Sequence, residues 1–282
     1  MSRLNPLMLA LLAGLPVGAA SGERPSLSGV RRWICHYGPR VSEASWASLD
    51  MAIVDPDSFE RPVSTGPVAL AYVSVGEADE RRSFWKSVEG KPFVVEVNPE
   101  WAGAHRVDLR AKAWRELLLE KVVPDALAKG YDGVMLDTID VAAYLESSAP
   151  ARFAGSVDAA VSFVLELRTR FPKTVIVINN GLPLLERVGD AVDGVLVEDL
   201  YTHCSPDAKH CAKTPAKIRR SKENALDAFR KRTGKPVFNL VYSGLSDRTG
   251  RRVKRAVKRS RRKGYAVYLT APALDRLGEV DP

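Results

Sequence analysis

Short runs of consecutive apolar residues recur along the chain, and each is followed by polar or glycine-containing residues and then by a stretch long enough for a helix. The runs are continuously apolar rather than alternating, which is typical of strands covered on both faces. They predict strands at Trp33–Tyr37, Met51–Asp55, Val68–Val75, Gly133–Asp137, Val175–Asn179, Val195–Glu198, Val237–Tyr242 and Ala266–Thr270. Helices are predicted at Ala111–Lys129, Ser156–Phe171, Pro215–Thr233 and Arg251–Lys263.

Repeated alternation of strand and helix predicts a parallel sheet. Eight or nine such units within about 250 residues favour a closed (β/α)8 barrel of the TIM type over an open, doubly wound sheet. A ninth and weaker strand, Ala104–Leu109, falls between the third and fourth of the main strands. Because no low-complexity linker or fixed-period repeat divides the chain, we expect a single α/β domain over residues 21–282.

The first twenty residues have the pattern of a secretory signal peptide. Arg3 provides a positive start, Leu7–Ala20 form an apolar run, and the run ends in small residues. The run is shorter than the roughly 20 apolar residues that a membrane span needs, and no later segment resembles one. We therefore expect cleavage near Ala20, secretion to the periplasm or the exterior, and no transmembrane anchor.

The composition is that of an ordinary globular protein, with 45% hydrophobic and 27% charged residues. Several motifs are missing: there is no G-x-G-x-x-G after the first strand, no G-x-x-x-x-G-K-[ST] and no G-x-S-x-G. The four histidines form neither H-x-H nor H-E-x-x-H. Nucleotide-binding enzymes, serine hydrolases of the α/β type and histidine-rich metalloenzymes are therefore disfavoured, and no metal or organic cofactor is expected.

Two carboxylates stand out among the residues that end the predicted strands. Asp137 follows the apolar run 133–136 and Glu198 follows the run 194–197, so each emerges from a buried strand. Barrel enzymes place their chemistry at the carboxyl ends of the strands. Glycoside cleavage needs one protonated and one ionised carboxyl group, and burial and neighbouring groups can separate two carboxyl pKa values in this way. Asp137 and Glu198 are therefore the candidate catalytic pair.

Other strand ends carry tyrosine, asparagine and further carboxylates, which are the side chains of a sugar-binding site. Aromatic rings stack on the apolar faces of sugars, whereas amides and carboxylates bond their hydroxyl groups. The candidates for substrate binding are Tyr37, Asp55, Tyr72, Glu77, Asp140, Asn180, Tyr201 and Tyr242. Asp132 is interpreted as a turn residue, and Asp108 as either the end of the weak strand or the cap of the following helix.

Three cysteines leave one without a partner if the other two pair. Cys204 and Cys211 are close together in a polar stretch, and a disulfide between them suits an oxidising compartment. Because His203 and His210 lie beside the two cysteines, the alternative interpretation is a metal site. Cys35 lies in a predicted strand and is expected to be a small, buried apolar residue.

The net charge is +8, and much of the excess is local. Residues 248–263 contain ten lysines or arginines, with Val253, Ala256 and Val257 at helical spacing. The simplest interpretation is a helix with a solvated outer face, and the alternative is contact with an anionic surface or polymer. Nucleic acid is not expected as a partner, because no aromatic residues lie among the cations to stack on bases.

Three phrases of the sequence resemble those of a known family. They are AYVSVGE at 71–77, GYDGVMLDTID at 130–140 and VEDLY at 197–201, and the ordered series they belong to spans nearly all of the chain after residue 32. The sequence is similar to the endo-α-1,4-polygalactosaminidases, glycoside hydrolase family 114, and to their extracellular relatives. The middle phrase is the most specific of the three.

The resemblance implies a (β/α)8 barrel and hydrolysis within an α-linked amino-sugar polysaccharide. It implies a catalytic Asp on the middle phrase and a catalytic Glu at a later strand end, which are Asp137 and Glu198 here. It also implies that Cys204 and Cys211 form a disulfide. Two features depart from the characterised members: this chain is basic although their substrates are cationic, and Glu198 is followed by Asp199 rather than by a second glutamate.

These observations lead us to expect a secreted glycoside hydrolase acting on a polysaccharide, with Asp137 as nucleophile and Glu198 as acid/base. That division assumes a retaining mechanism, which requires carboxyl groups about 5–5.5 Å apart, whereas about 6.5–9.5 Å would indicate inversion. One alternative is a non-catalytic polysaccharide-binding barrel at the cell surface. Another is a surface-associated protein held to an anionic polymer by the basic segment 248–263.

Overall fold

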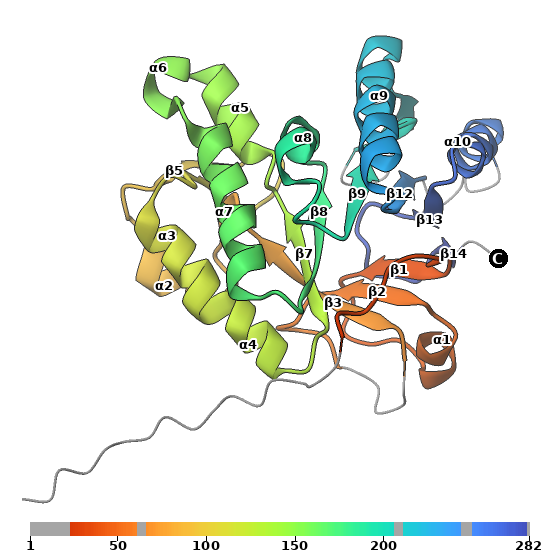
Figure 1. Ribbon diagram of the computed structural model, residues 1–282, viewed down its shortest axis with the longest axis horizontal. Helices are drawn as coiled ribbons and strands as arrows, with labels where there is room; N and C mark the ends of the chain where they lie inside the picture. The colour runs from red at the N-terminus through yellow and green to blue at the C-terminus, as the bar shows by residue number, and fades with distance from the viewer. Residues whose placement is uncertain (1–22, 61–65, 206–210, 244–249, 281–282) are drawn as a thin grey trace, which may run out of the picture.

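The computed structural model describes residues 23–60, 66–205, 211–243 and 250–280, so the predicted signal peptide, residues 1–20, lies outside the described residues (Figure 1). Within these ranges, eight parallel strands form one sheet in the order β1-β2-β3-β7-β8-β9-β12-β13. The strands are β1 (Trp33–His36), β2 (Met51–Val54), β3 (Val68–Ser74), β7 (Gly133–Asp137), β8 (Val175–Asn179), β9 (Gly194–Glu198), β12 (Val237–Tyr242) and β13 (Ala266–Thr270). A two-residue strand, β14 (Glu279–Val280), pairs antiparallel with β13.

The first and last parallel strands, β1 and β13, lie next to each other and nearly close the sheet into a barrel. At the seam between β1 and β13, the backbone N–H of Tyr37 donates to the carbonyl of Leu274 at 2.7 Å. The Trp33 ring packs edge-on against Phe238 of β12 and lies 5.6 Å from the ring of Tyr268 of β13. The structure confirms the predicted (β/α)8 architecture.

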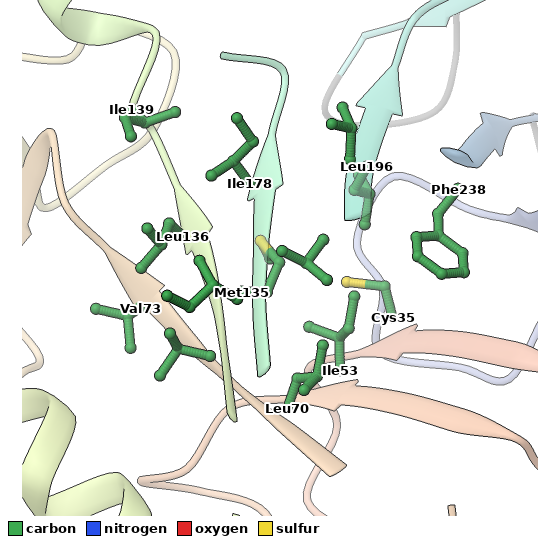
Figure 2. Close-up of a cluster of buried hydrophobic side chains, with 14 of the residues drawn as sticks. Cys35, Ile53, Leu70, Val73, Met135, Leu136, Ile139, Ile178, Leu196 and Phe238 are labelled. Atoms are coloured by element: carbon green, nitrogen blue, oxygen red, sulfur yellow. The ribbon is translucent and has the colours of Figure 1, made fainter. Parts of the chain in front are cut away.

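The strands form where the sequence is continuously apolar, because both faces of each strand are covered. Every residue of β1, β2, β8, β12 and β13 is buried. Figure 2 shows side chains from neighbouring strands, among them Cys35, Ile53, Leu70, Met135 and Leu196, gathered in one apolar cluster. Cys35 is unpaired and buried, as predicted. Burial of such side chains contributes roughly 1.5–3 kcal/mol each to the stability of the barrel.

Helices lie around the outside of the barrel strands (Figure 1). The longest are α7 (Ser156–Arg170), α9 (Ala216–Thr233) and α10 (Arg251–Arg262). The shorter ones are α1 (Glu43–Ala47), α2 (Trp85–Val88), α5 (Val141–Ser148), α6 (Pro150–Phe153), η2 (Leu182–Leu184) and α8 (Leu185–Val188). No helix among the described residues is long and apolar enough to cross a membrane.

The predicted helix Ala111–Lys129 is interrupted. It consists of α3 (Lys112–Leu117), a π-helical turn η1 (Leu118–Val122) and α4 (Val123–Ala128). Pro124, at the start of α4, has no N–H to donate to the carbonyl four residues earlier, and its ring displaces that carbonyl. The turn before the proline therefore widens into a π-helix.

The weak strand predicted at Ala104–Leu109 is not part of the barrel. It is β6 (Ala104–Val107), the middle strand of an antiparallel sheet with β4 (Glu77–Asp79) and β5 (Val94–Val97), inserted between β3 and β7. Gly76 joins β3 to β4, and a Cβ at this position would lie 2.1 Å from the carbonyl oxygen of Thr138. The inserted sheet therefore starts at the C-terminal mouth of the barrel, close against the end of β7.

Two acidic residues outside the mouth fix the backbone. The Asp132 carboxylate accepts a hydrogen bond from the N–H of Ala69 at 2.8 Å and so ties the start of β7 to β3. Asp108 accepts from the N–H of Arg110 and pairs with its guanidinium at 2.7 Å. Because α3 has no side-chain cap, the helix-cap role considered for Asp108 is wrong.

Candidate active site

Three neighbouring barrel strands end in polar side chains that meet at the mouth of the barrel. β7 ends in Asp137, β8 in Asn179 and β9 in Glu198. Because β8 pairs in parallel with both of the other strands, Asn179 lies between the two carboxylates. The structure therefore brings the two predicted catalytic residues together at the C-terminal end of the barrel, where barrel enzymes carry out their chemistry.

The amide of Asn179 joins the two carboxylates. Its Nδ2 donates to Oδ1 of Asp137 at 2.8 Å and to Oε1 of Glu198 at 2.7 Å. The two acceptor oxygens can therefore be no farther apart than these two distances laid end to end, about 5.5 Å. This upper limit for the two oxygens admits the separation of about 5–5.5 Å found in retaining glycosidases and lies below the range of about 6.5–9.5 Å for inverting ones.

Asp137 is held by both its own strand and β3. Its Oδ1 also accepts from the N–H of Thr138 at 2.8 Å, and the Tyr72 hydroxyl bonds to the same carboxylate. Thr138 is itself fixed, because its Oγ1 accepts from the N–H of Gly76 at 2.9 Å and donates to the carbonyl of Asp137 at 2.7 Å. These contacts leave the Asp137 side chain in one orientation.

Glu198 has an environment that favours its protonated form. Burial and the negative charge of Asp137 raise the pKa of Glu198 to about 8, although hydrogen bonds from Asn179 and Tyr242 act in the opposite direction. A carboxyl group with this pKa carries its proton at neutral pH, which is the requirement for an acid catalyst. Glu198 is therefore suited to the role of proton donor at this end of the barrel.

We expect kcat/KM to fall as the pH rises through about 8, because the raised pKa of Glu198 keeps its proton in place up to that point and releases it above. The measurement is a pH–rate profile on a polysaccharide substrate. Asp199→Asn should move the alkaline limb to lower pH, because the charge of Asp199 also raises the pKa of Glu198. Asp125→Asn, on the exposed side of α4, should leave the profile unchanged. An alkaline limb below pH 6 in the wild type would contradict this assignment.

Each of the three site residues is followed by a residue in the left-handed region of backbone space. The φ angles are 57° at Thr138, 58° at Asn180 and 53° at Asp199, and one other described non-glycine residue, Leu274, has a positive φ. Asparagine and aspartate tolerate this conformation, whereas a β-branched threonine adopts it rarely. Conformations of this kind cost about 1–3 kcal/mol and concentrate at functional sites. The backbone is therefore strained at the mouth of the barrel.

Asn180 lies beside the pair but bonds to the backbone. Its Oδ1 accepts from the N–H of Glu198 at 3.2 Å, and its own N–H donates to the carbonyl of Leu196 at 2.9 Å. Lys222 of α9 reaches the same strand end, where its Nζ donates to the carbonyl of Glu198 at 2.7 Å. Burial lowers the pKa of Lys222. Asn180 thus fastens β8 to β9, and Lys222 brings one positive charge to the edge of the site.

Three of the tyrosines proposed from sequence surround the pair. Tyr72 bonds to Asp137, and Tyr242 bonds to Glu198. The ring of Tyr37 meets the ring of Tyr72 edge-on, with centroids 5.0 Å apart. Burial raises the pKa of all three phenols well above the usual value, so their hydroxyl groups stay protonated and can act as hydrogen-bond donors.

Asp55 contacts the site through an arginine. Its carboxylate pairs with Arg82 at 2.7 Å, and Arg82 also contacts Asp57 at 2.9 Å. The guanidinium lies over the ring of Tyr72, 5.5 Å from its centroid. Asp55 therefore fixes the arginine that packs on Tyr72.

Two more carboxylates add negative charge near Asp137. Glu77 of β4 is 8% exposed and accepts from Nδ2 of Asn98 at 2.8 Å, and burial, with the charge of Asp137, raises its pKa. Asp140, before α5, keeps an exposed surface, yet enough protein surrounds it to reduce its hydration. Burial of this kind and the charge of Asp137 raise the pKa of Asp140 to about 6.

The structure does not bring Tyr201 to the carboxylates. Its hydroxyl donates to Glu223 of α9 at 3.0 Å, and Arg259 of α10 pairs with the same carboxylate. The Arg259 guanidinium also lies 5.4 Å from the centre of the Tyr201 ring. Although Tyr201 follows Glu198 by only three positions, the chain turns at Asp199, and the ring packs between the barrel and its outer helices.

The structure confirms the disulfide between Cys204 and Cys211. It joins β10 (Thr202–Cys204) to β11 (Cys211–Lys213), two short antiparallel strands that follow β9. Both thiols are used in this bond, so neither serves the metal site considered as an alternative. His210 lies outside the described residues, and the rest of the described chain contains no cluster of three or more metal-ligating side chains.

Removal of the disulfide by Cys204→Ser with Cys211→Ser should lower the free energy of unfolding by about 2 kcal/mol, because the bond restricts the unfolded chain. In a protein of this size the midpoint of thermal unfolding should fall by about 4–8 °C. The measurement is a thermal melt with and without reductant. Reductant should lower the midpoint of the wild type and leave that of the double variant unchanged; a wild type insensitive to reductant would contradict the expectation.

Sequence reasoning did not identify four residues that shape the site, namely Asn179, Lys222, Arg82 and Thr138. Asn179 carried a usable signal, because it ends a buried strand after four apolar residues just as Asp137 does. Lys222 and Arg82 carried no such sequence signal, because they reach the site from a helix and from a loop that lie elsewhere in the sequence.

Together, the fold and this site define the class of the protein. A (β/α)8 barrel with a close pair of carboxyl groups at its C-terminal mouth is the arrangement of a glycoside hydrolase. The sequence profile of glycoside-hydrolase family GH114 matches residues 17–281. The chain belongs to this family and is a glycosidase.

Relatives and solved structures agree with this membership. A protein of Deinococcus radiodurans with no described function is 27% identical over an alignment of 275 residues that covers 90% of this chain and 85% of the relative. The glycoside hydrolase domain of PelA from Pseudomonas aeruginosa has a TM-score of 0.77 and 25% identity, covering 90% of this chain and 99% of that domain. Aspergillus fumigatus Ega3, solved in complex with galactosamine, has a TM-score of 0.66 at 14% identity and covers 93% of this chain and 100% of its own; this likeness shows the fold alone.

Proposed function

We propose that this chain is a secreted glycoside hydrolase that cleaves within an α-linked amino-sugar polysaccharide and retains the anomeric configuration. Asp137 is the nucleophile and Glu198 the acid/base. The observation that carries the proposal is the Asn179 amide, which lies within hydrogen-bond distance of both carboxylates. Carboxyl groups at this separation allow one to attack the anomeric carbon while the other protonates the leaving oxygen.

The surroundings of the two carboxylates suit these different roles. N–H donors from Thr138 and Asn179 hold Oδ1 of Asp137 in a fixed position, whereas burial and the charge of Asp137 raise the pKa of Glu198. In the first step, an Asp137 oxygen bonds to the anomeric carbon while the bond to the leaving sugar breaks, and Glu198 gives its proton to the departing oxygen. In the second step, Glu198 takes a proton from water, and the water oxygen replaces Asp137 at the anomeric carbon.

The negative charge around the two carboxylates favours a substrate that contains a cationic sugar. Glu77, Asp140 and Asp199 lie within electrostatic reach of the pair. A protonated amino group donates strong hydrogen bonds to carboxylates of this kind. The net charge of +8 does not oppose this, because the dense cations of α10 lie on an outer helix and charges beyond about 10 Å are largely screened at 0.1 M salt. Tyr37, Tyr72 and Tyr242 supply rings and hydroxyl groups for the sugar itself.

Residues 1–20 are, in this proposal, a signal peptide, and residues 21–282 form one secreted domain. The disulfide supports an oxidising compartment, and the family profile matches residues 17–281, which include nearly all of that range. N-terminal sequencing of exported protein identifies the first mature residue, which should lie close to Ser21.

The proposal is tested by digestion of defined polymers. The panel contains an α-1,4-linked galactosamine polymer, its fully N-acetylated form, chitosan and a neutral galactan, with products read by mass spectrometry and early anomers by NMR. We expect oligosaccharides of intermediate size from the galactosamine polymer, released first as the α-anomer. A β-anomer released first would refute retention. Cleavage confined to the neutral or acetylated polymers would refute the cationic substrate, and binding without new reducing ends would refute catalysis.

A further inference from the structure

The outward face of α10 carries only positive charge. Seven of its side chains are exposed, all of them lysine or arginine, and we call five of these, Arg251, Lys254, Arg255, Lys258 and Arg262, the basic stripe. They lie opposite Val253, Ala256 and Ser260, which are buried against the barrel. None of the five forms an ion pair with any described residue.

The acids of the neighbouring helix α9 are paired with residues outside the basic stripe. α9 contains two carboxylates, Glu223 and Asp227, and both turn toward α10. Glu223 pairs with Arg259 at 2.7 Å, and Asp227 pairs with Lys263. These pairs fasten the two helices to each other, and the charge of the basic stripe remains uncompensated.

The like charges of the basic stripe destabilise α10. Like charges four residues apart repel one another, as Arg251 and Arg255 or Lys258 and Arg262 do. Two arginines lie in the first turn, where the helix dipole disfavours cations, and that turn has neither an acidic residue nor a side-chain cap. A helix that served only solubility would mix charges of both signs. The local conflict therefore indicates a binding role for the stripe.

The form of the basic stripe points to the ligand. From Arg251 to Arg262 it extends about 16 Å along the helix, with about three cations for every two turns of 5.4 Å. It contains no aromatic ring that could stack on a nucleic-acid base and no large apolar side chain that could enter a bilayer. We propose that the basic stripe binds a linear anionic polysaccharide with regularly spaced carboxylates, which arginine can pair with through two parallel hydrogen bonds.

The position of the basic stripe relates it to the active site. The Arg252 guanidinium, beside the first residue of the stripe, donates to the carbonyl of Cys211 in the hairpin that follows Glu198. The stripe therefore starts at the mouth of the barrel and runs down its outer side. A polyanion bound there lies next to an acidic mouth, so the protein can adhere to one polymer while it works on another of opposite charge.

The test compares two variants with equal loss of charge. The stripe variant carries glutamine at all five stripe positions. The control variant carries it at five exposed cations elsewhere, Arg31, Lys86, Lys91, Lys112 and Lys121. The probe is polygalacturonate, with binding measured over a series of salt concentrations. We expect the stripe variant to bind at least about tenfold more weakly, with a shallower salt dependence, and the control variant to stay within about twofold of the wild type.

Binding by the basic stripe is independent of the proposed catalysis, so both variants should cleave a short substrate at the rate of the wild type. Equal losses of binding in the two variants would show that net charge alone is responsible and would overturn it. So would tighter binding of the wild type to vesicles of anionic lipid, or to double-stranded DNA, than to polygalacturonate at the same charge concentration. Dextran sulfate, tested in parallel, distinguishes sulfate from carboxylate; preference for sulfate would refute the carboxylate assignment.

Discussion

Asp137→Asn should lower kcat/KM by at least about 10⁴-fold, because the amide cannot form the covalent bond to the sugar. Glu198→Gln should lower it by about 10²–10⁴-fold, because the leaving oxygen loses its proton donor. The measurement is the rate of release of reducing ends from the polysaccharide. Asp190→Asn is the control, since this carboxylate is 87% exposed and pairs with Arg232 on the outside of the barrel. Full activity in either site variant would exclude that residue from the chemistry.

The roles of the two carboxylates can be separated with an activated aryl glycoside and azide. With Glu198→Ala, Asp137 can still form the glycosyl enzyme, and azide then displaces it to give a glycosyl azide of retained configuration. With Asp137→Ala, azide takes the place of the nucleophile and gives the inverted product. An exchange of the two products between the variants would reverse the assignment. Asp199→Asn should remain active, which distinguishes Glu198 from its neighbour.

Asn179→Ala should lower kcat by about 10²-fold or more, because it removes the donor that positions both carboxylates. The loss has a signature that a general structural defect would not produce. Because the Asn179 hydrogen bond lowers the pKa of Glu198, its removal should move the alkaline limb of the pH–rate profile to higher pH. The measurements are kcat and this limb in purified, folded protein.

Asn239→Ala is the matched control for Asn179. Asn239 also lies on a buried barrel strand, where its Nδ2 donates to Oγ of Ser260 at 2.7 Å, away from the carboxylates. Its replacement should reduce stability and leave the alkaline limb in place. An Asn179→Ala variant with the pH profile of the wild type would show that the amide does not act on Glu198.

The barrel could be predicted from sequence because its strands are covered on both faces. A run such as Val175–Asn179 is apolar throughout, and the eight predicted strands agree with the structure to within one residue at each end. The inserted sheet could not be predicted in the same way. Its strands β4 and β5 are short and partly exposed, and the sequence pattern of their partner β6 places it in the series of barrel strands. Pairing with a distant strand, rather than local pattern, decides such elements.

The site could be predicted in part for the same reason. A strand that is buried up to its last residue delivers that residue to the mouth, so Asp137 and Glu198 were accessible from the sequence. The position of Tyr201 could not be predicted, because one backbone turn at Asp199 moves the ring from the mouth of the barrel to the helix layer. The position of Lys222 could not be predicted either, because only the packing of α9 brings its ammonium group to Glu198.

The overall charge was a poor guide to the site. A sum of +8 describes the whole chain, whereas the side chains around Asp137 include carboxylates such as Glu77 and Asp140. The cations of α10 lie on an outer helix (Figure 1). A folded chain can thus present opposite charges to two different partners.

The left-handed residues that follow Asp137, Asn179 and Glu198 bear on how such an enzyme can evolve. Few residues accept this backbone conformation: glycine, asparagine, aspartate, or a threonine held as firmly as Thr138. Mutation at these positions is therefore narrowly restricted, whereas wall residues such as Tyr37 are under no such backbone constraint. A lineage built on this barrel would inherit the three turns unchanged and acquire new sugar preferences by exchanging the side chains around them.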